Sequence, residues 1–317
     1  MGDRTQKSAN NNRKAFGYAA MTILFWSTVA SAFALTLRHV RPFELLFYSS
    51  LFAMLLLGMI VLVTPRKAEF RLWTRRDYQL SAVLGLLNPF LYYLLLFEAY
   101  DRLPAQEALP LNFAWPIVLV VLSMIILRQK IHPWSIFALL ISFLGVIIIA
   151  TRGAPLSMQF ENPPGVVMAL GSTVIWALYW IYSSRDNRDS VCRLFSNFVF
   201  GVAYLLLFAA LDKGVAVPSL PGLAGTLYIA MFKMALAFVC WLQALKLASN
   251  AAQVSSLIYI TPFFSLVVIH FVVGEDIYPS TMTGLLLIIG GIVGQQWVER
   301  RYAEKSQVKG RTELSGK

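Results

Sequence analysis

Lys233 lies within residues 222–245, a stretch whose other side chains are almost all apolar. A charged side chain in an apolar, membrane-spanning segment is costly, so it usually marks a functional site. Its ammonium could bind the carboxylate of a substrate, or a carboxylate of the protein during a transport cycle. A permanent ion pair or contacts to backbone carbonyls would be a structural alternative. Because no acidic residue is obvious at the same depth, we expect Lys233 to lie in a substrate path.

Aromatic and polar side chains recur at a similar depth in other apolar segments. Indole rings can stack on a flat ligand or hold a cation, and buried polar groups need partners, so we expect a central cavity, although bulky core packing is the alternative. Asn88 and Tyr92 are four residues apart and should share a helix face, as should Trp176 and Tyr179. The candidate substrate-binding residues are Trp26, Ser27, Asn88, Tyr92, Asn112, Trp115, Trp176, Tyr179, Lys233 and Tyr259.

Two further groups could control access to such a cavity. Three prolines interrupt apolar segments, where each removes a backbone donor and favours a kink that either moves during transport or is a static bend; they are Pro89, Pro116 and Pro262. Four titratable residues near the outer ends of segments could form a gate or a proton relay, or could simply be solvated; they are Glu44, Glu98, Glu107 and His270.

The composition indicates that these residues lie in membrane-spanning segments. Of 317 residues, 58% are hydrophobic and only 14% are charged, which is typical of a polytopic membrane protein. Segments of about 20 apolar residues can each cross the membrane as a helix. We predict ten spans, at residues 17–37, 43–63, 79–99, 105–127, 134–151, 165–184, 191–211, 222–245, 251–273 and 280–298.

The basic residues indicate the orientation of these spans. The net charge is +11, and most of the 27 Lys and Arg residues fall in the two termini and in alternate loops. Such asymmetry predicts that both termini are cytoplasmic. The charge is therefore a topological signal with a weak attraction to anionic lipid, and nucleic acid is not an expected partner. Cys192 and Cys240 indicate neither a disulfide framework nor a metal site.

The second half of the chain repeats the first at an offset of 146 residues. This register places Pro116 on Pro262, Pro133 on Pro279 and Gly145 on Gly291. Each repeat has five predicted crossings, so the second repeat must be inverted relative to the first. The loop at residues 128–130 is basic, and its counterpart at 274–276 is acidic, which agrees with opposite sides of the membrane.

Two five-helix repeats with a proline midway along each fourth helix and a Pro-then-Gly pattern in each fifth helix resemble the EamA-type drug/metabolite transporter superfamily. The resemblance covers about residues 16 to 299. One departure is that an acidic residue often found before the fifth helix is present as Glu275 but is replaced by Gln129. The implied organisation is a cytoplasmic tail at 1–15, a first repeat at 16–152, a second repeat at 163–299 and a cytoplasmic tail at 300–317.

The resemblance implies an all-α membrane protein of the bacterial inner membrane, and the aromatic lining resembles that of aromatic-amino-acid exporters within the superfamily. We therefore expect a secondary transporter that exports amino acids, with aromatic and other large apolar ones favoured. Lys233 would bind the carboxylate, the aromatic residues would accept the side chain, and Asn88 and Asn112 would donate or accept hydrogen bonds. No cofactor or metal is expected, and a monomer is favoured, with the oligomeric state open.

Other functions remain open at this point. A drug or organic-cation exporter is possible on the same scaffold, although Lys233 would repel a cation. A polytopic membrane enzyme is a weaker alternative, because the sequence contains no HExxH pair, acidic metal cluster or nucleophile motif. The absence of a P-loop argues against ATP as the driver, and the absence of a mid-depth acid favours facilitated efflux over proton antiport.

Overall fold

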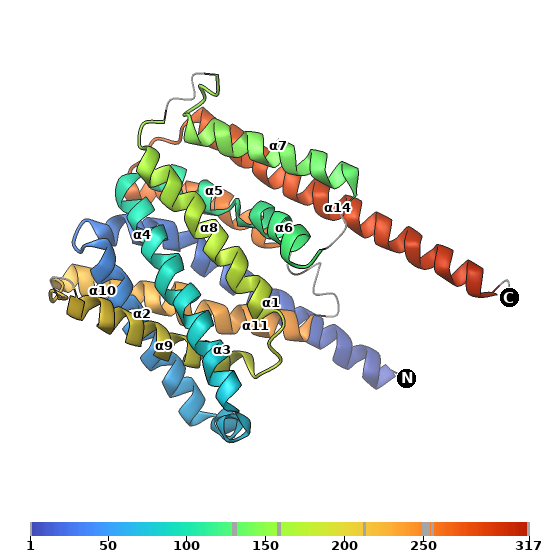
Figure 1. Ribbon diagram of the computed structural model, residues 1–317, viewed down its shortest axis with the longest axis horizontal. Coiled ribbons are helices and arrows are strands. Elements are labelled where there is room, and N and C mark those ends of the chain that lie inside the picture. The colour runs from blue at the N-terminus through green and yellow to red at the C-terminus, as the bar shows by residue number, and fades with distance from the viewer. Residues whose placement is uncertain are drawn as a thin grey trace.

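The computed structural model describes residues 2–128, 132–156, 160–211, 214–248, 254 and 257–315, and this part of the chain is helical, with no strand. Figure 1 shows a bundle of helices with both termini at the same end. In chain order the elements are α1 (Gly2–Leu37), α2 (Pro42–Val63), η1 (Pro65–Leu72), α3 (Arg75–Gly85), η2 (Leu86–Leu91), α4 (Tyr92–Arg102), α5 (Ala105–Asn112), α6 (Trp115–Ile126), α7 (Pro133–Ala150), α8 (Pro163–Ser183), α9 (Ser190–Leu211), α10 (Leu220–Ile229), η3 (Ala230–Ala235), α11 (Leu236–Leu247), η4 (Leu257–Ile260), α13 (Thr261–Val268), η5 (Ile269–Val273) and α14 (Pro279–Ser315).

Within the described residues, nine helices are long and apolar enough to cross a membrane, which makes the chain a multi-pass membrane protein. They are Asn11–Leu37, Pro42–Val63, Arg75–Arg102, Ala105–Ile126, Pro133–Ala150, Pro163–Ser183, Ser190–Leu211, Leu220–Leu247 and Pro279–Tyr302. The remaining apolar helix, Leu257–Val273, is shorter. The ninth predicted span starts at residue 251, but residues 251–253 and 255–256 lie outside the described residues, as do Gln129 and Lys130 of the predicted basic loop.

Several of these helices are interrupted near their middle. Asn88 has non-helical dihedral angles (φ −143°, ψ 115°) directly before Pro89. Because two residues four apart share a face only on a continuous helix, the expected common face of Asn88 and Tyr92 is wrong. Pro116 and Pro262 lie in the first turns of α6 and α13. A first turn tolerates proline, since its backbone N–H would have no intrahelical partner there.

Small residues allow α7 and α14 to pack closely along their length, as Figure 1 shows. A Cβ atom added to Gly291 would collide with Ser142 and the carbonyl of Ala138, and one added to Gly145 would collide with the carbonyl of Gly284. The Ser142 hydroxyl also donates a hydrogen bond of 2.9 Å to the Ile288 carbonyl. Close backbone approach through small residues is a common mode of helix association in membranes.

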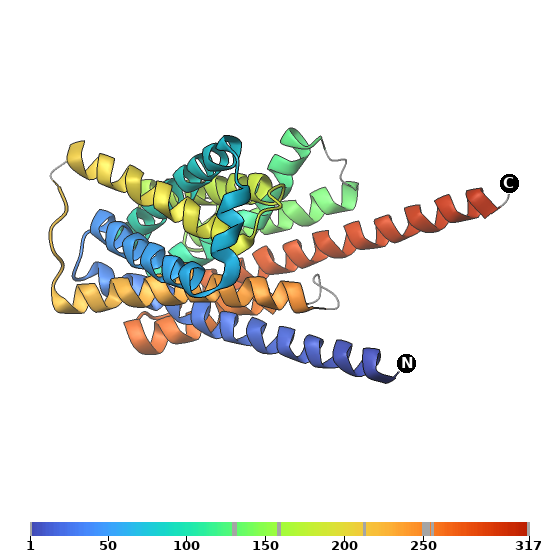
Figure 2. The same cartoon turned by 90° about the horizontal axis from the view of Figure 1, so that it is seen from below.

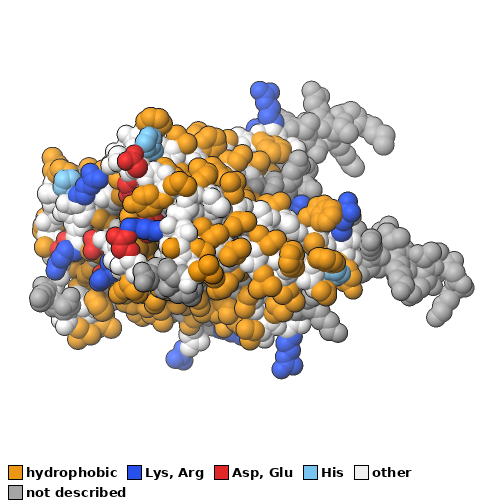
Figure 3. Space-filling view, turned by 90° about the horizontal axis from the view of Figure 1, so that it is seen from above, with side chains coloured by type: hydrophobic (Ala, Val, Ile, Leu, Met, Phe, Trp, Pro, Cys, Tyr) orange, Lys and Arg blue, Asp and Glu red, His pale blue; other side chains and the backbone are white. Residues whose placement is uncertain are grey.

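The other helices surround a region between the two halves of the chain. Helix α1 packs against α11 and α13, α4 packs against α8, and α2 packs against α9; Figure 2 shows α1 beside the second-half helices. Figure 3 shows hydrophobic side chains over the middle of one face, with the acidic side chains gathered at one end. An apolar belt with charges displaced to the ends is what a lipid environment requires.

Candidate functional site

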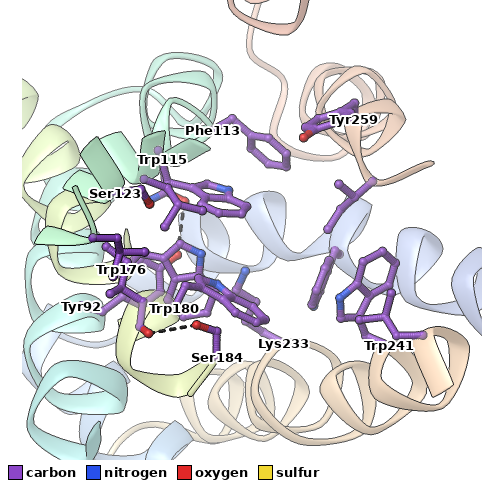
Figure 4. A pocket seen from close by; sticks show the side chains of 17 residues that line it. Tyr92, Phe113, Trp115, Ser123, Trp176, Trp180, Ser184, Lys233, Trp241 and Tyr259 are labelled. Atoms are coloured by element: carbon purple, nitrogen blue, oxygen red, sulfur yellow. Dashed lines mark hydrogen bonds between the residues drawn. The ribbon is translucent and has the colours of Figure 1, made fainter. Parts of the chain in front are cut away.

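The central region contains a pocket of about 420 Å³, which Figure 4 shows from close by. Its wall is mainly aromatic, and it is built from α1, α4, α5, α6, α8, η3, α11, η4 and the residues that join α5 to α6. The lining residues are Trp26, Tyr92, Asn112, Phe113, Trp115, Leu119, Ser123, Leu127, Trp176, Trp180, Ile181, Ser184, Lys233, Trp241, Leu245, Ile258 and Tyr259. An apolar pocket with a few convergent polar groups is the usual form of a small-molecule site.

Lys233 lies in η3, where the helix widens between α10 and α11. Its ammonium nitrogen is 5.2 Å from the centroid of the Trp26 ring, a distance suited to a cation–π contact. Trp26 in turn contacts Trp241, with ring centroids 5.8 Å apart. Lys233 forms no ion pair with any residue that the structure describes. Its charge is therefore available to a ligand in the pocket.

A second aromatic group covers the side of the pocket formed by α4, α6 and α8. The Tyr92 and Trp176 rings are stacked, with centroids 4.4 Å apart, and Trp176 meets Trp180 edge to face at 5.9 Å. Trp115 and Trp180 are nearly parallel at 6.5 Å. In Figure 4 these rings lie on one side of the pocket, and Trp241 and Tyr259 lie on the other side. Flat rings on both sides suit a flat, apolar ligand group.

A chain of hydrogen bonds fixes the polar part of the same wall. The Tyr92 hydroxyl donates to Oδ1 of Asn112 at 3.2 Å, and Nδ2 of Asn112 donates to the Ser172 hydroxyl at 2.9 Å. Ser172 then donates to the Ala169 carbonyl at 2.6 Å. The Asn112 amide is thereby held in one orientation at the end of α5. At the other edge, the Tyr259 hydroxyl accepts a hydrogen bond from Gln296.

Three of the expected substrate-binding residues do not line this pocket. Ser27 donates to the Ile23 carbonyl at 2.7 Å, and Asn88 is buried in η2. Tyr179 is buried and stacks on Trp176 from outside the lining. The structure brings the other seven together, and it adds Trp180 and Trp241, which were not among the expected residues. Their spacing was a usable signal, because Trp180 follows Trp176 by one helical turn and Trp241 is two turns beyond Lys233.

The pocket extends toward the end of the bundle that carries both termini. Leu127 and Ser184, which directly follow α6 and α8, line it, together with Leu245 near the end of α11. Figure 1 places the ends of these helices on the side of the two termini. Toward the opposite end, the buried rings of Phe33, Phe97 and Tyr100 pack together, with Phe33 4.9 Å from Phe97 and 5.1 Å from Tyr100. None of these three residues lines the pocket.

Polar contacts tie the helices together at this opposite end. The Glu275 carboxylate accepts hydrogen bonds from the backbone N–H groups of Ala105 (2.9 Å) and Gln106 (3.0 Å) at the start of α5. The Gln106 side chain donates to the Asp276 carbonyl at 2.6 Å and accepts from the Tyr278 N–H at 2.7 Å. An acid at a helix N-terminus satisfies free donors and complements the helix dipole. The loop before α14 is therefore fastened to α5.

The four titratable residues expected near the outer ends also lie at this end. Glu107 is buried and accepts a hydrogen bond of 2.6 Å from Nε of Arg152. Glu44 pairs with Arg41 at 2.7 Å, and Glu98 pairs with Arg102 at 3.2 Å in a more exposed position. Nδ1 of His270 is 3.0 Å from the Glu275 carbonyl. None of these four residues lines the central pocket.

Comparisons with known proteins agree with a membrane transporter. An uncharacterized transporter, YvbV, of Bacillus subtilis is 26% identical over 238 residues, which is 74% of this chain and 76% of that protein. The aromatic amino acid exporter YddG of Ancylobacter novellus is 26% identical over 167 residues, covering 52% of this chain and 56% of the relative. A probable terminal-alkyne amino-acid exporter of Streptantibioticus cattleyicolor is 26% identical over 231 residues, covering 71% and 74%.

One solved crystal structure aligns with a TM-score of 0.62 at 19% identity, covering 92% of this chain and 99% of the other, and this likeness shows the fold alone. The EamA-like transporter family matches the sequence in two places, at residues 13–151 and 163–294. Together these matches cover most of the protein. The chain belongs to the EamA-like transporter family.

Proposed function

We propose that the protein is a secondary transporter that exports amino acids across the bacterial inner membrane by alternating access, with aromatic and other large apolar ones favoured. The observation that carries this proposal is Lys233, whose ammonium reaches a pocket walled by indole and phenol rings. A carboxylate would bind the ammonium, and an aromatic or apolar side chain would lie against the rings. The names of two relatives, an aromatic amino acid exporter and a probable terminal-alkyne amino-acid exporter, support the same class.

The proposed architecture has ten helices in two inverted repeats, at residues 16–152 and 163–299. The contacts between α7 and α14 support it. Gly145 meets Gly284, and Gly291 meets Ala138. The 146-residue offset converts each of these contacts into the other, because it maps Ala138 on Gly284 and Gly145 on Gly291. Such reciprocity is the signature of a two-fold relation, and the separate family matches to the two halves agree with it.

The distribution of basic residues supports cytoplasmic termini, and with this orientation the pocket extends toward the cytoplasmic side. In this inward-facing arrangement the ring cluster of Phe33, Phe97 and Tyr100 closes the outer path. The outer gate includes Glu275, with the pair of Glu107 and Arg152 beside it. The interruptions at Pro89, Pro116 and Pro262 lie where half-helices can move about the pocket.

We assign the carboxylate to Lys233 and the substrate side chain to Trp26, Trp115, Trp176, Trp180 and Tyr259. Asn112 contributes a fixed amide beside Tyr92. Tyr179 stacks on Trp176 from behind this wall. Export is facilitated, without a proton carrier at mid-depth, because the described lining contains no acidic residue.

Reconstituted liposomes test the proposal. They would be loaded with labelled phenylalanine, tryptophan, threonine or an organic dication, and efflux would be followed with and without a pH gradient. We expect the aromatic amino acids to leave faster than from protein-free liposomes, and Lys233→Ala to slow them by more than about tenfold, since an uncompensated charged group costs several kcal/mol. Lys246→Ala, an exposed position on α11, is the matched control. Efflux of the dication alone would instead establish a cation exporter.

A further inference from the structure

The charge in the central pocket is unbalanced. Among the described residues that line the pocket, Lys233 carries a positive charge and none is Asp or Glu. The segments that follow α6 and α11 and lie outside the described residues, 129–131, 249–253 and 255–256, contain no acidic residue in the sequence either. The polar oxygens of the lining belong to neutral side chains: Tyr92, Asn112, Ser123, Ser184 and Tyr259.

Four acidic residues outside the pocket have partners elsewhere in the structure. Glu44 and Glu107 pair with arginines at the opposite end of the bundle. Glu275 accepts from the first turn of α5, and Glu299 accepts from the Ser135 hydroxyl at 2.6 Å and from the His132 N–H at 3.1 Å. None of these four carboxylates lines the pocket, so none of them stands beside Lys233 to neutralise a second cation.

Two tryptophans that line the pocket have an indole N–H without an acceptor in the described part of the chain. The indole Nε1–H groups of Trp26 and Trp180 are buried and have no hydrogen-bond partner among the described residues. Both residues line the pocket, and the Trp26 ring lies beside the Lys233 ammonium. A buried donor without a partner is costly, so such donors call for a ligand that supplies acceptors. A carboxylate has two acceptor oxygens and no donor when ionised.

We infer that the pocket selects carboxylates that carry no free α-ammonium, so that deaminated or N-acylated aromatic amino acids bind more tightly than the zwitterionic amino acids. This inference rests on the proposed function and concerns which aromatic carboxylates the same site prefers. A zwitterion brings an ammonium close to Lys233, where like charges repel and no carboxylate compensates. An aromatic carboxylate without that group satisfies the donors and adds no second cation.

Intrinsic tryptophan fluorescence gives a direct binding assay, because five tryptophans line the pocket. The purified full-length protein would be titrated with phenylalanine, N-acetylphenylalanine, 3-phenylpropanoate and phenylalanine amide. We expect half-saturation by N-acetylphenylalanine and 3-phenylpropanoate at concentrations about tenfold lower than by phenylalanine, and the weakest response from the amide. Phenylalanine binding as tightly as the two carboxylates, or no response to either of them, would overturn the inference.

Variants of Lys233 separate the effect of its charge on binding from the effect of the shape of the pocket. Lys233→Gln should abolish the difference between N-acetylphenylalanine and phenylalanine, whereas Lys233→Arg should keep it. Lys246→Gln, on the exposed side of α11, should leave the difference unchanged. A preference that survives in folded Lys233→Gln, as checked by thermal unfolding, would contradict the assignment.

A transport assay in liposomes distinguishes a failure of this inference from a failure of the proposed function. If liposomes export phenylalanine but binding shows no preference for the blocked forms, the inference fails and the transporter proposal stands. If only N-acetylphenylalanine is exported, the inference stands and amino acids are not the substrate.

Discussion

Lys233 and Trp26 come from opposite halves of the chain, yet the Lys233 ammonium lies 5.2 Å from the centroid of the Trp26 ring. The contact joins η3 to α1 at the pocket, beside the position that we propose for the substrate carboxylate. A helix of the first half therefore positions the charged residue of the second half.

Replacing Trp26 should weaken substrate binding even though Lys233 is retained. Trp26→Leu removes the ring that orients the ammonium, and a desolvated cation–π contact is worth about 1–2 kcal/mol, so the half-saturating concentration should rise about tenfold. Trp26→Phe should lose less, because a smaller aromatic face remains. Trp134→Leu is the control, since Trp134 is 65% exposed on α7. Equal binding by wild type and Trp26→Leu would show that the contact does not position the lysine.

Removing the Glu275 carboxylate should loosen the end of the bundle opposite the termini. Glu275→Ala leaves the backbone N–H groups of Ala105 and Gln106 without their acceptor. We expect hydrogen–deuterium exchange to accelerate about tenfold in residues 105–112 and in the loop before α14. Glu98→Ala should change exchange there little, because its pair with Arg102 is more exposed and such pairs are weak. The same exchange pattern in both variants would show that the hydrogen bonds to Glu275 do not hold this end of the bundle together.

Two adjacent glycines of α14 should respond oppositely to alanine. A Cβ on Gly291 would collide with Ser142 and the Ala138 carbonyl, whereas a Cβ on Gly290 would meet nothing within 4 Å. Gly291→Ala should therefore destabilise the fold by about 1–3 kcal/mol through overpacking. Gly290→Ala should be neutral or stabilise by up to about 1 kcal/mol, because alanine favours the helix. Thermal unfolding in detergent measures both, and equal midpoints would contradict the close packing of α7 on α14.

The loop between α8 and α9 should make stability depend on pH. The side chain of Asp186 pairs with Arg188 at 2.5 Å, and the Arg188 guanidinium lies 4.3 Å from the Trp73 ring and donates to the Ser81 hydroxyl at 2.9 Å. Burial opposes ionisation of Asp186, but hydrogen bonds and charge from Arg188 outweigh it and lower the pKa of that carboxyl.

Because the folded-state pKa is lowered, this contribution to stability is present above the unfolded value of about 4 and is lost as pH falls through the folded value. The free energy of unfolding should thus decrease on acidification below about pH 4, and the decrease should be smaller in Asp186→Asn. Unfolding midpoints measured across that range provide the check. An identical acid profile for wild type and variant would remove Asp186 as a source of the effect.

The sequence by itself determined the class of protein and the depth of the charged residue. Apolar runs of membrane-spanning length specify helices wherever they occur, because backbone polar groups in lipid must be satisfied within the segment. A charged side chain is costly in lipid, so the position of Lys233 inside such a run indicated a functional site. The repeat offset of 146 residues also matches Gly145 with Gly291, and this match is visible without any structure.

Only the tertiary structure decided which side chains meet. Depth along a helix does not specify its rotation, so Ser27 and Tyr179 were expected in the pocket but point elsewhere, whereas Trp180 and Trp241 line it. Regular helical geometry also fails where the backbone is irregular, as at Asn88. Rotation, local breaks and the partner of each ring depend on how helices distant in the sequence pack together, and that information is not contained in the periodicity of one segment.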